Sequence, residues 1–415
     1  MKSKLILCLV FLMQVQWICA QTGEHIDWEY EIELLARKLA EKHPGLFFER
    51  DSAWFFQKMS ELASRTPDRT LFQVSIEIQQ LIADMGDAHT QINYHFLIDK
   101  SRILPLDCYW FEDGIYVLET DRRYEAALGK KLIAINGFPI NVVIDSLATL
   151  LVLDNPSVLK NRIPRMLTWV QLLEYFGFSG KNELSLTVSG SAWEEVPVFL
   201  PYELGELVGA RPPVLPLGWQ EANSYFREQY FDAEKLYYIQ YNRCWSREAE
   251  EDYGSGASAL FMPSFKEFEK QVLRVLRKEK IDKLVFDLRF NQGGHAEQGT
   301  EFIRKIKRTL PKKHGEVFLL VGRGTDSEAL INAVDLIKSM KVILVGEESS
   351  GKPNHFGEVK RFVLPESGLV VSYPGTYFSL LEEDPSSLDP ELKTRISFEQ
   401  YMQGLDPAME AVRRY

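Results

Sequence analysis

The chain has 415 residues and a formal net charge of −11 at pH 7, and 45% of its residues are hydrophobic. That length suffices for two or three domains with a large core. An acidic chain without a basic cluster argues against a nucleic-acid-binding protein and against binding to anionic membranes.

The first 20 residues have the pattern of a secretory signal peptide. Two lysines precede an apolar run over residues 5–18, and residues 18–20 (Ile-Cys-Ala) end in a small residue. The run is too short to span a bilayer, and no later segment resembles a membrane span. Cys19 leaves lipoprotein anchoring as an alternative, although the residue before it is not small. We therefore expect an exported protein, periplasmic or extracellular, with simple cleavage favoured over anchoring.

Cleavage leaves two cysteines, Cys108 and Cys244. They have no metal-type spacing. Export permits a disulfide between them, and two buried free thiols are the alternative.

Residues 21–90 are expected to form an N-terminal helical region. Apolar residues recur at helical spacing between Glu31 and Met85, and Gly86 ends the pattern. The segment Asp87-Ala88-His89-Thr90 follows, and the alternation over residues 91–94 predicts a strand.

Residues 91–210 are expected to form a separate middle module. Short strands are predicted at 114–118 and 132–135, and Asn136-Gly137 is a strong turn signal. Three prolines between 212 and 216 indicate a boundary.

Residues 211–415 have the regular pattern of an α/β core. Strands are predicted at 236–241, 284–288, 317–321 and 342–345, and helices separate them. The first of these helices opens with a capping box from Ser264 to Glu267. This alternation predicts a largely parallel sheet.

A serine and a lysine 25 residues apart, Ser327 and Lys352, follow two successive strands of this core. In a parallel sheet both would emerge at the same carboxyl edge, where ligands and catalysis are favoured. A serine beside a lysine that can lose its proton is a nucleophile with its base. Such a lysine must be desolvated or lie near another cation, so its pKa should lie well below about 10.4.

Backbone N–H groups near Gly293, Gly294 and Glu328 could hold an oxyanion. Paired glycines allow a close approach of the backbone, and the helix that starts near Ser327 has free N–H groups. Taken singly, each feature has an ordinary alternative. The serine could be a helix cap, Lys352 a surface-turn residue and the glycines a tight turn.

A phosphate-binding loop is excluded. Residues 346–352 fit the first seven places of that pattern, but Pro353 stands where a Ser or Thr should hold Mg²⁺. Glu347 and Glu348 would also repel phosphate.

Four segments, in register along the chain, resemble the C-terminal processing (tail-specific) serine peptidases. Residues 287–294 (Asp-Leu-Arg-Phe-Asn-Gln-Gly-Gly) resemble the signature Asp-Leu-Arg-x-Asn-x-Gly-Gly. In that family a serine opens the next helix, and a catalytic lysine follows in a Gly-Lys pair at the spacing seen here. The other matches are to an Asp-x-His-Thr segment, to the end of a PDZ-type module and to a closing Asp-Pro: residues 87–90, 132–140 and 406–408.

The resemblance implies a divergent bacterial-type member with a crotonase-like α/β catalytic core, an N-terminal helical region and a PDZ-like middle module. It implies an exported serine endopeptidase that uses Ser327 as nucleophile and Lys352 as base on a protein or peptide substrate. No metal or other cofactor is implied. Related proteases of the tricorn type use a histidine as base in the region of His89, so a Ser-His peptidase is an alternative.

Some residues depart from the family pattern. Asp326 and Glu328 flank the serine, and Pro353 follows the lysine. No clear loop for binding a peptide carboxylate is found in the middle module. These departures motivate another alternative, a non-catalytic peptide- or ligand-binding protein on the same fold. The sequence predicts neither the substrate nor the oligomeric state.

Overall fold

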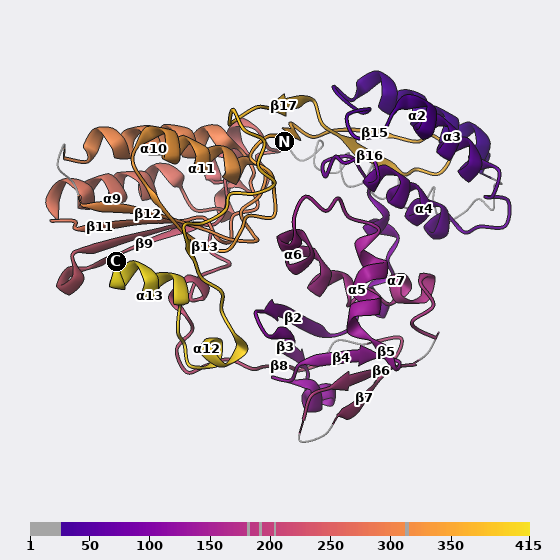
Figure 1. The fold of residues 1–415 in the computed structure, drawn as a ribbon, viewed down its shortest axis with the longest axis horizontal. Coiled ribbons are helices and arrows are strands. Elements are labelled where there is room, and N and C mark those ends of the chain that lie inside the picture. Colours follow the sequence, from indigo (N-terminus) through magenta and orange to yellow (C-terminus); the bar gives the residue numbers. More distant parts are fainter. Residues whose placement is uncertain (1–25, 181–182, 191–192, 203–204, 312–314) are drawn as a thin grey trace, which may run out of the picture. The chain divides into compact units, whose positions relative to one another are not determined.

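The computed structural model describes residues 26–180, 183–190, 193–202, 205–311 and 315–415. The described residues divide into two compact units, one with residues 26–97 and 356–376, the other with 98–355 and 377–415 (Figure 1). The predicted signal peptide lies outside the described residues. Within the described part of the chain, no helix is both long and apolar enough to cross a membrane.

Within the described residues, the first unit contains three α-helices and a three-stranded antiparallel sheet of order β1-β16-β15. Buried Glu31 joins them, because its carboxylate accepts the N–H of Glu366 at 2.9 Å and the N–H of Ser367 at 3.3 Å. The elements are α2 (Trp28–Lys42), α3 (Ser52–Ala63), α4 (Leu71–Ala83), β1 (Gln91–Ile92), β15 (Lys360–Val363) and β16 (Val370–Tyr373).

The strand predicted over residues 91–94 is confirmed for Gln91 and Ile92 and wrong for Asn93 and Tyr94. The strand ends at Ile92, and Tyr94 opens the 3₁₀ helix η1 (Tyr94–Leu97). The chain turns there because the Asn93 carbonyl accepts the N–H of Phe96 at 3.3 Å.

The second unit begins with two small antiparallel sheets, of order β2-β3-β8 and β5-β4-β6-β7. The predicted turn at Asn136-Gly137 is confirmed, since φ is +49° and +77° at these residues, as a tight hairpin between β4 and β5 requires. The elements are β2 (Leu106–Phe111), β3 (Gly114–Asp121), β4 (Leu132–Ile135), β5 (Phe138–Pro139), α5 (Ile140–Ala148), α6 (Pro156–Met166), α7 (Val170–Tyr175), β6 (Glu183–Val188), β7 (Glu194–Phe199) and β8 (Leu207–Gly209).

The main sheet of the second unit has the order β18-β13-β12-β11-β10-β9. All neighbours pair in parallel except β9 and β10, which confirms the predicted largely parallel sheet. Its strands are β9 (Phe226–Phe231), β10 (Leu236–Tyr241), β11 (Lys283–Asp287), β12 (Glu316–Val321), β13 (Ile343–Gly346) and β18 (Leu392–Lys393).

Helices cover both faces of this sheet (Figure 1). One core packs α9 (Phe265–Lys278), α10 (Ala296–Thr309) and α11 (Glu328–Ser339) on one face, and a smaller core packs α13 (Pro407–Arg414) on the other. The strands are therefore buried on both sides, which explains their continuous apolar runs.

The capping box predicted for α9 forms only in part. Ser264 Oγ accepts the Glu267 N–H at 3.2 Å, but among the described residues the Glu267 side chain does not accept the Ser264 N–H in return. The Glu248 carboxylate instead accepts the next N–H, that of Phe265, at 2.9 Å. The remaining elements are η2 (Lys100–Arg102), η3 (Arg122–Ala127), η4 (Leu217–Trp219), η5 (Asp232–Glu234), α8 (Arg247–Asp252), η6 (Ala259–Phe261), β14 (His355–Gly357), β17 (Thr376–Phe378) and α12 (Phe398–Met402).

Candidate active site

Three loops leave the carboxyl ends of β11, β12 and β13, which are neighbours in the parallel sheet. The strand ends are in register. The loops over residues 288–294, 322–327 and 347–354 therefore start at one edge of the sheet, which is where the sequence placed its candidate residues.

Ser327 has an unusual backbone for a residue other than glycine. Its φ is +53° and its ψ is −127°, the values of the first central residue of a type II′ turn, where glycine is usual. It directly precedes α11 but its side chain does not cap that helix. Backbone strain of this kind costs on the order of 1–3 kcal/mol and is concentrated at functional sites. A serine on a strained strand-to-helix turn is also the geometry of a nucleophile elbow.

The loop that carries Ser327 is held against the loop that follows β11. The Asp326 N–H donates to the Asn291 carbonyl at 3.1 Å. At Gly324 a Cβ atom would lie 2.5 Å from the Arg289 carbonyl oxygen, so only glycine allows this approach.

The paired glycines lie next to Ser327. A Cβ at Gly293 would be 3.0 Å from the Ser327 Cβ. The Gly293 N–H, however, donates to Asn291 Oδ1 at 2.9 Å, and the Gly294 N–H donates to the Glu328 carboxylate at 2.9 Å. Two of the three donors predicted for an oxyanion therefore already have acceptors in this conformation.

The third predicted donor is the Glu328 N–H, the first of α11. A Cβ atom built on Gly293 would lie 3.1 Å from the Glu328 nitrogen, so the two residues are in close contact. No described residue accepts a hydrogen bond from the Glu328 N–H. Free N–H groups in the first helical turn are donors for a bound anion.

Asp326 connects Ser327 to the middle part of the unit. Its Oδ1 accepts the Ser327 N–H at 2.8 Å, and its Oδ2 accepts from Arg162 of α6 at 3.0 Å. A Cβ at Gly351 would lie 2.4 Å from Asp326 Oδ1, so the loop that carries Lys352 packs on the same carboxylate.

Asn155, the N-cap of α6, holds the loop of Lys352, residues 347–354. Its Nδ2 donates to the carbonyls of Ser349 and Ser350 at 3.0 and 3.1 Å. Helix α6 thus contacts both the loop of Ser327 and the loop of Lys352.

Lys352 forms an ion pair. Its Nζ donates to the Asp384 carboxylate at 3.2 Å. Partial burial alone would lower the pKa of Lys352, but the hydrogen bond to Asp384 and the negative charges of Asp154 and Asp384 raise it above its ordinary value. The predicted lowering of this pKa is therefore wrong for this conformation, because a carboxylate rather than a cation or an apolar wall faces the ammonium.

His89 belongs to the first unit. Its N–H donates to buried Asp87, whose carboxylate also accepts from Thr90 Oγ1 and, at 3.1 Å, from His43 Nε2. The Gly45 N–H donates to His43 Nδ1 at 3.0 Å, so Nδ1 is the acceptor of this ring and Nε2 faces Asp87 as its donor. The Asp-x-His-Thr segment thus forms a compact hydrogen-bonded turn, with the His89 side chain 18% exposed.

A buried charge network beneath the loops has a role that sequence reasoning missed. The Arg289 guanidinium bridges Asp287 at 2.7 Å and Asp406 at 2.8 Å. Tyr238 donates to Asp287 at 2.6 Å, and the Gly218 N–H donates to Asp406 at 3.0 Å. The Asp-Leu-Arg signature and the closing Asp-Pro were the signals for this pairing, but nothing local to either indicated that they meet.

The two described cysteines form no disulfide, so the alternative of two buried free thiols is confirmed. Cys108 and Cys244 are free and buried. Burial raises the pKa of both thiols to about 12, so both stay protonated at neutral pH.

The fold is similar to that of known structures. No family model and no curated protein matches the sequence. The structure of mature CPAF complexed with lactacystin is similar with a TM-score of 0.62 at 12% identity, over 94% of this chain and 97% of that one. Mature CPAF alone gives a TM-score of 0.59 at 12% identity, over 93% and 95%. The photosystem II D1 C-terminal processing protease covers 93% of this chain and 99% of its own at 15% identity, but its TM-score of 0.39 supports no conclusion.

At these identities the likeness concerns the fold alone. The chain has a mixed α/β fold similar to that of CPAF.

Proposed function

We propose that this protein is an exported serine endopeptidase with Ser327 as its nucleophile. The observation that carries the proposal is the strained Ser327 backbone on a strand-to-helix turn, beside the close approach of Gly293. A structural serine at a helix start would need neither feature, since an ordinary N-cap has extended backbone and bonds its own helix.

The proposed reaction is acyl transfer. Ser327 Oγ attacks the scissile carbonyl carbon and gives its proton to a base, which returns a proton to the leaving amine. Water then hydrolyses the acyl-enzyme with the same base. The Glu328 N–H would stabilise the oxyanion first, and the Gly294 N–H would join it once the Glu328 carboxylate moves away.

Lys352 is the proposed base. It lies in the loop that packs on Asp326, and Asp326 in turn holds the Ser327 N–H. It can accept a proton only after its contact with Asp384 is broken, since a paired ammonium is no base. His89 is the alternative base, as in a tricorn-like Ser-His peptidase.

We further propose that the protein is a divergent member of the C-terminal processing peptidases and acts on proteins or peptides. It includes a crotonase-like core, a PDZ-like middle module, and export to the periplasm or the cell exterior. N-terminal sequencing of the exported protein tests the export step, with Gln21 expected as the first residue.

A fluorophosphonate probe tests the proposed function. The full-length protein should be labelled once, at Ser327, and should cleave a denatured protein substrate. Ser327→Ala should lose both properties while keeping its circular dichroism spectrum. Labelling that persists in Ser327→Ala would refute the assignment.

A non-catalytic peptide- or ligand-binding protein is the second candidate. The acceptor already bound to the Gly294 N–H and the Lys352–Asp384 ion pair favour it. A folded protein that takes up no probe at any pH between 6 and about 10.4, the ordinary pKa of lysine, would establish this reading.

A further inference from the structure

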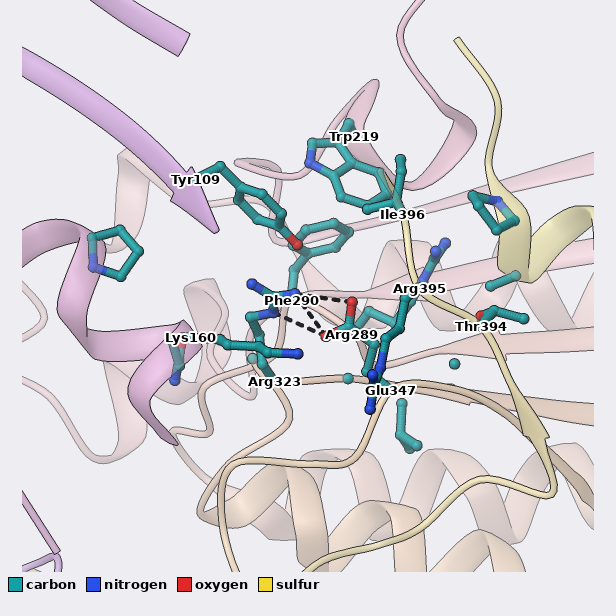
Figure 2. A pocket seen from close by; sticks show the side chains of 18 of the residues that line it. Tyr109, Lys160, Trp219, Arg289, Phe290, Arg323, Glu347, Thr394, Arg395 and Ile396 are labelled. Atoms are coloured by element: carbon teal, nitrogen blue, oxygen red, sulfur yellow. Dashed lines mark hydrogen bonds and ion pairs between the residues drawn. The ribbon is translucent and has the colours of Figure 1, made fainter. Parts of the chain in front are cut away.

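A cavity of about 210 Å³ lies at the carboxyl edge of the main sheet, on the face where α13 packs (Figure 2). The candidate residues Ser327, Gly293 and Glu328 are not among its lining residues. The residues that line it come from β2, α6, η4, the loops after β11, β12 and β13, and the chain around β18 and α13. They include Tyr109, Lys160, Trp219, Arg289, Phe290, Arg323, Glu347, Arg395 and Ile396.

Four cations line the cavity, and two of them are already paired. Arg289 bridges Asp287 and Asp406, as described above. Arg323 binds Glu347 through two nitrogens, at 3.0 and 2.8 Å. Both guanidinium groups are therefore fixed in place by carboxylates.

The other two cations, Lys160 and Arg395, are unpaired. Neither forms a hydrogen bond or a salt bridge with any residue that the structure describes. Lys160 reaches from α6 toward the cavity (Figure 2). Burial and the positive charges of Arg323 and Arg395 lower the pKa of Lys160, against the attraction of Glu347. A half-buried ammonium without a carboxylate partner can pair with the anionic group of a ligand.

The lining itself holds four cations and one carboxylate, Glu347. Asp287 and Asp406 lie behind Arg289, and the negative charge of Glu348 also acts on Lys160. These three carboxylates offset the remaining excess of cations, so the site suits a monocarboxylate better than a phosphate, which carries nearly two negative charges at neutral pH.

The remaining wall is apolar and aromatic. The rings of Trp219 and Phe290 lie 5.1 Å apart in an edge-to-face contact, and Ile396 is 3% exposed. Burial raises the pKa of Tyr109 to about 12, so this phenol stays neutral. Pockets for drug-sized ligands measure about 300–1,000 Å³, so this smaller cavity suits a ligand of one ring or one branched chain.

We propose that this cavity binds a small monocarboxylate with an aromatic or branched apolar body. Its carboxylate lies between Lys160 and Arg395, and its body rests on Trp219 and Phe290. The same chemistry occurs in a free carboxylic acid and in the C-terminal residue of a peptide. The proposal does not depend on peptidase activity.

Calorimetric titration of the full-length Ser327→Ala protein tests the proposal without hydrolysis of a peptide. The probes are 3-phenylpropionate, its neutral amide, N-acetyl-Ala-Ala-Phe and the amide of that peptide. At least one carboxylate should bind with a stoichiometry of one, and its amide should bind about tenfold more weakly or not at all. The free acid and the peptide acid distinguish the two sources of the ligand.

Substitutions locate the binding. Lys160→Met and Arg395→Gln should each weaken carboxylate binding by about tenfold. Lys307→Met, an exposed lysine on α10 across the sheet, is the matched control and should leave it unchanged. The proposal fails if neither carboxylate binds, if the amides bind equally well, or if the double variant Lys160→Met/Arg395→Gln binds like the parent.

Discussion

The two acidic residues beside Ser327 both have defined partners. Asp326 accepts the Ser327 N–H and an Arg162 N–H, so it supports the turn that strains the serine. Glu328 accepts the Gly294 N–H, so its carboxylate lies where an oxyanion would need a donor. At the residue scale, one acid supports the proposed site and the other opposes it.

Glu328→Gln should accelerate fluorophosphonate labelling by about tenfold. The substitution removes a negative charge beside the position of the developing oxyanion, and a tenfold change in rate corresponds to about 1.4 kcal/mol of transition-state stabilisation. Stopped-flow labelling rates measure the effect. Asp335→Asn, which removes a charge from the same helix, should change the rate little. A slower Glu328→Gln would mean that the carboxylate holds the loop in its working form.

The pH profile identifies the base. Because the pKa of Lys352 is raised above its ordinary value, a lysine base would be protonated at neutral pH, and kcat/KM should still rise as the pH passes 10. In Asp384→Asn the hydrogen bond to a carboxylate is lost, the pKa falls, and the rising limb should move to lower pH. A histidine base would instead titrate near about 6.5.

Substitution of the two bases completes that test. With Lys352 as the base, Lys352→Arg and Lys352→Ala should be inactive, and His89→Ala should keep measurable turnover. A pH profile that is unchanged in Asp384→Asn, together with an active Lys352→Ala, would assign the base to His89.

At the element scale, α6 joins the two loops that carry the proposed dyad. Its N-cap Asn155 uses one oxygen to cap the helix, at 2.9 Å from the Ser157 N–H, and its Nδ2 to hold the carbonyls of the third loop. The middle part of the second unit thus fixes the geometry of the sheet edge, although none of its residues takes part in the proposed chemistry.

Asn155→Ala should slow labelling of Ser327 by about tenfold and lower the free energy of unfolding by about 1–3 kcal/mol, because buried carbonyls lose their donor. Asn155→Asp keeps the helix cap but has no N–H donors, so it separates the two roles. Labelling should be slow in both variants. A normal labelling rate in Asn155→Asp would mean that Asn155 acts only as a helix cap.

At the scale of the whole molecule, the Arg289 network ties β11, η4 and the start of α13 together through buried charges. Burial would raise the pKa of Asp406, but the Arg289 charge and the hydrogen bonds to Arg289, Gly218 and Met409 lower it overall. The stabilisation is therefore present above the ordinary pKa of aspartate and is lost as the pH falls through the lowered value.

Asp406→Ala should reduce the free energy of unfolding at pH 7 by about 3–5 kcal/mol, because it leaves a buried guanidinium with one carboxylate fewer. The difference from the parent should shrink below pH ~3.9, as the parent's own carboxylate becomes protonated. Urea unfolding at pH 7 and pH 3 measures both. A difference that does not depend on pH would mean that packing, and not charge, explains the loss.

The sequence by itself determined the features that local patterns encode. Continuous apolar runs predicted the parallel strands, because a strand buried on both faces needs no alternation. Asn136-Gly137 predicted its turn, because both residues tolerate positive φ. The order of strands and loops then placed Ser327 and Lys352 at one edge of the sheet.

Only the tertiary structure decided the partners of charged groups. Lys352 meets Asp384, Glu328 meets Gly294, and Asp326 meets Arg162, across separations of 32, 34 and 164 residues. No periodicity or motif encodes such pairs, because each depends on where loops from different elements converge. The pKa of Lys352 was predicted in the wrong direction for that reason, since a pKa is set by neighbours in space.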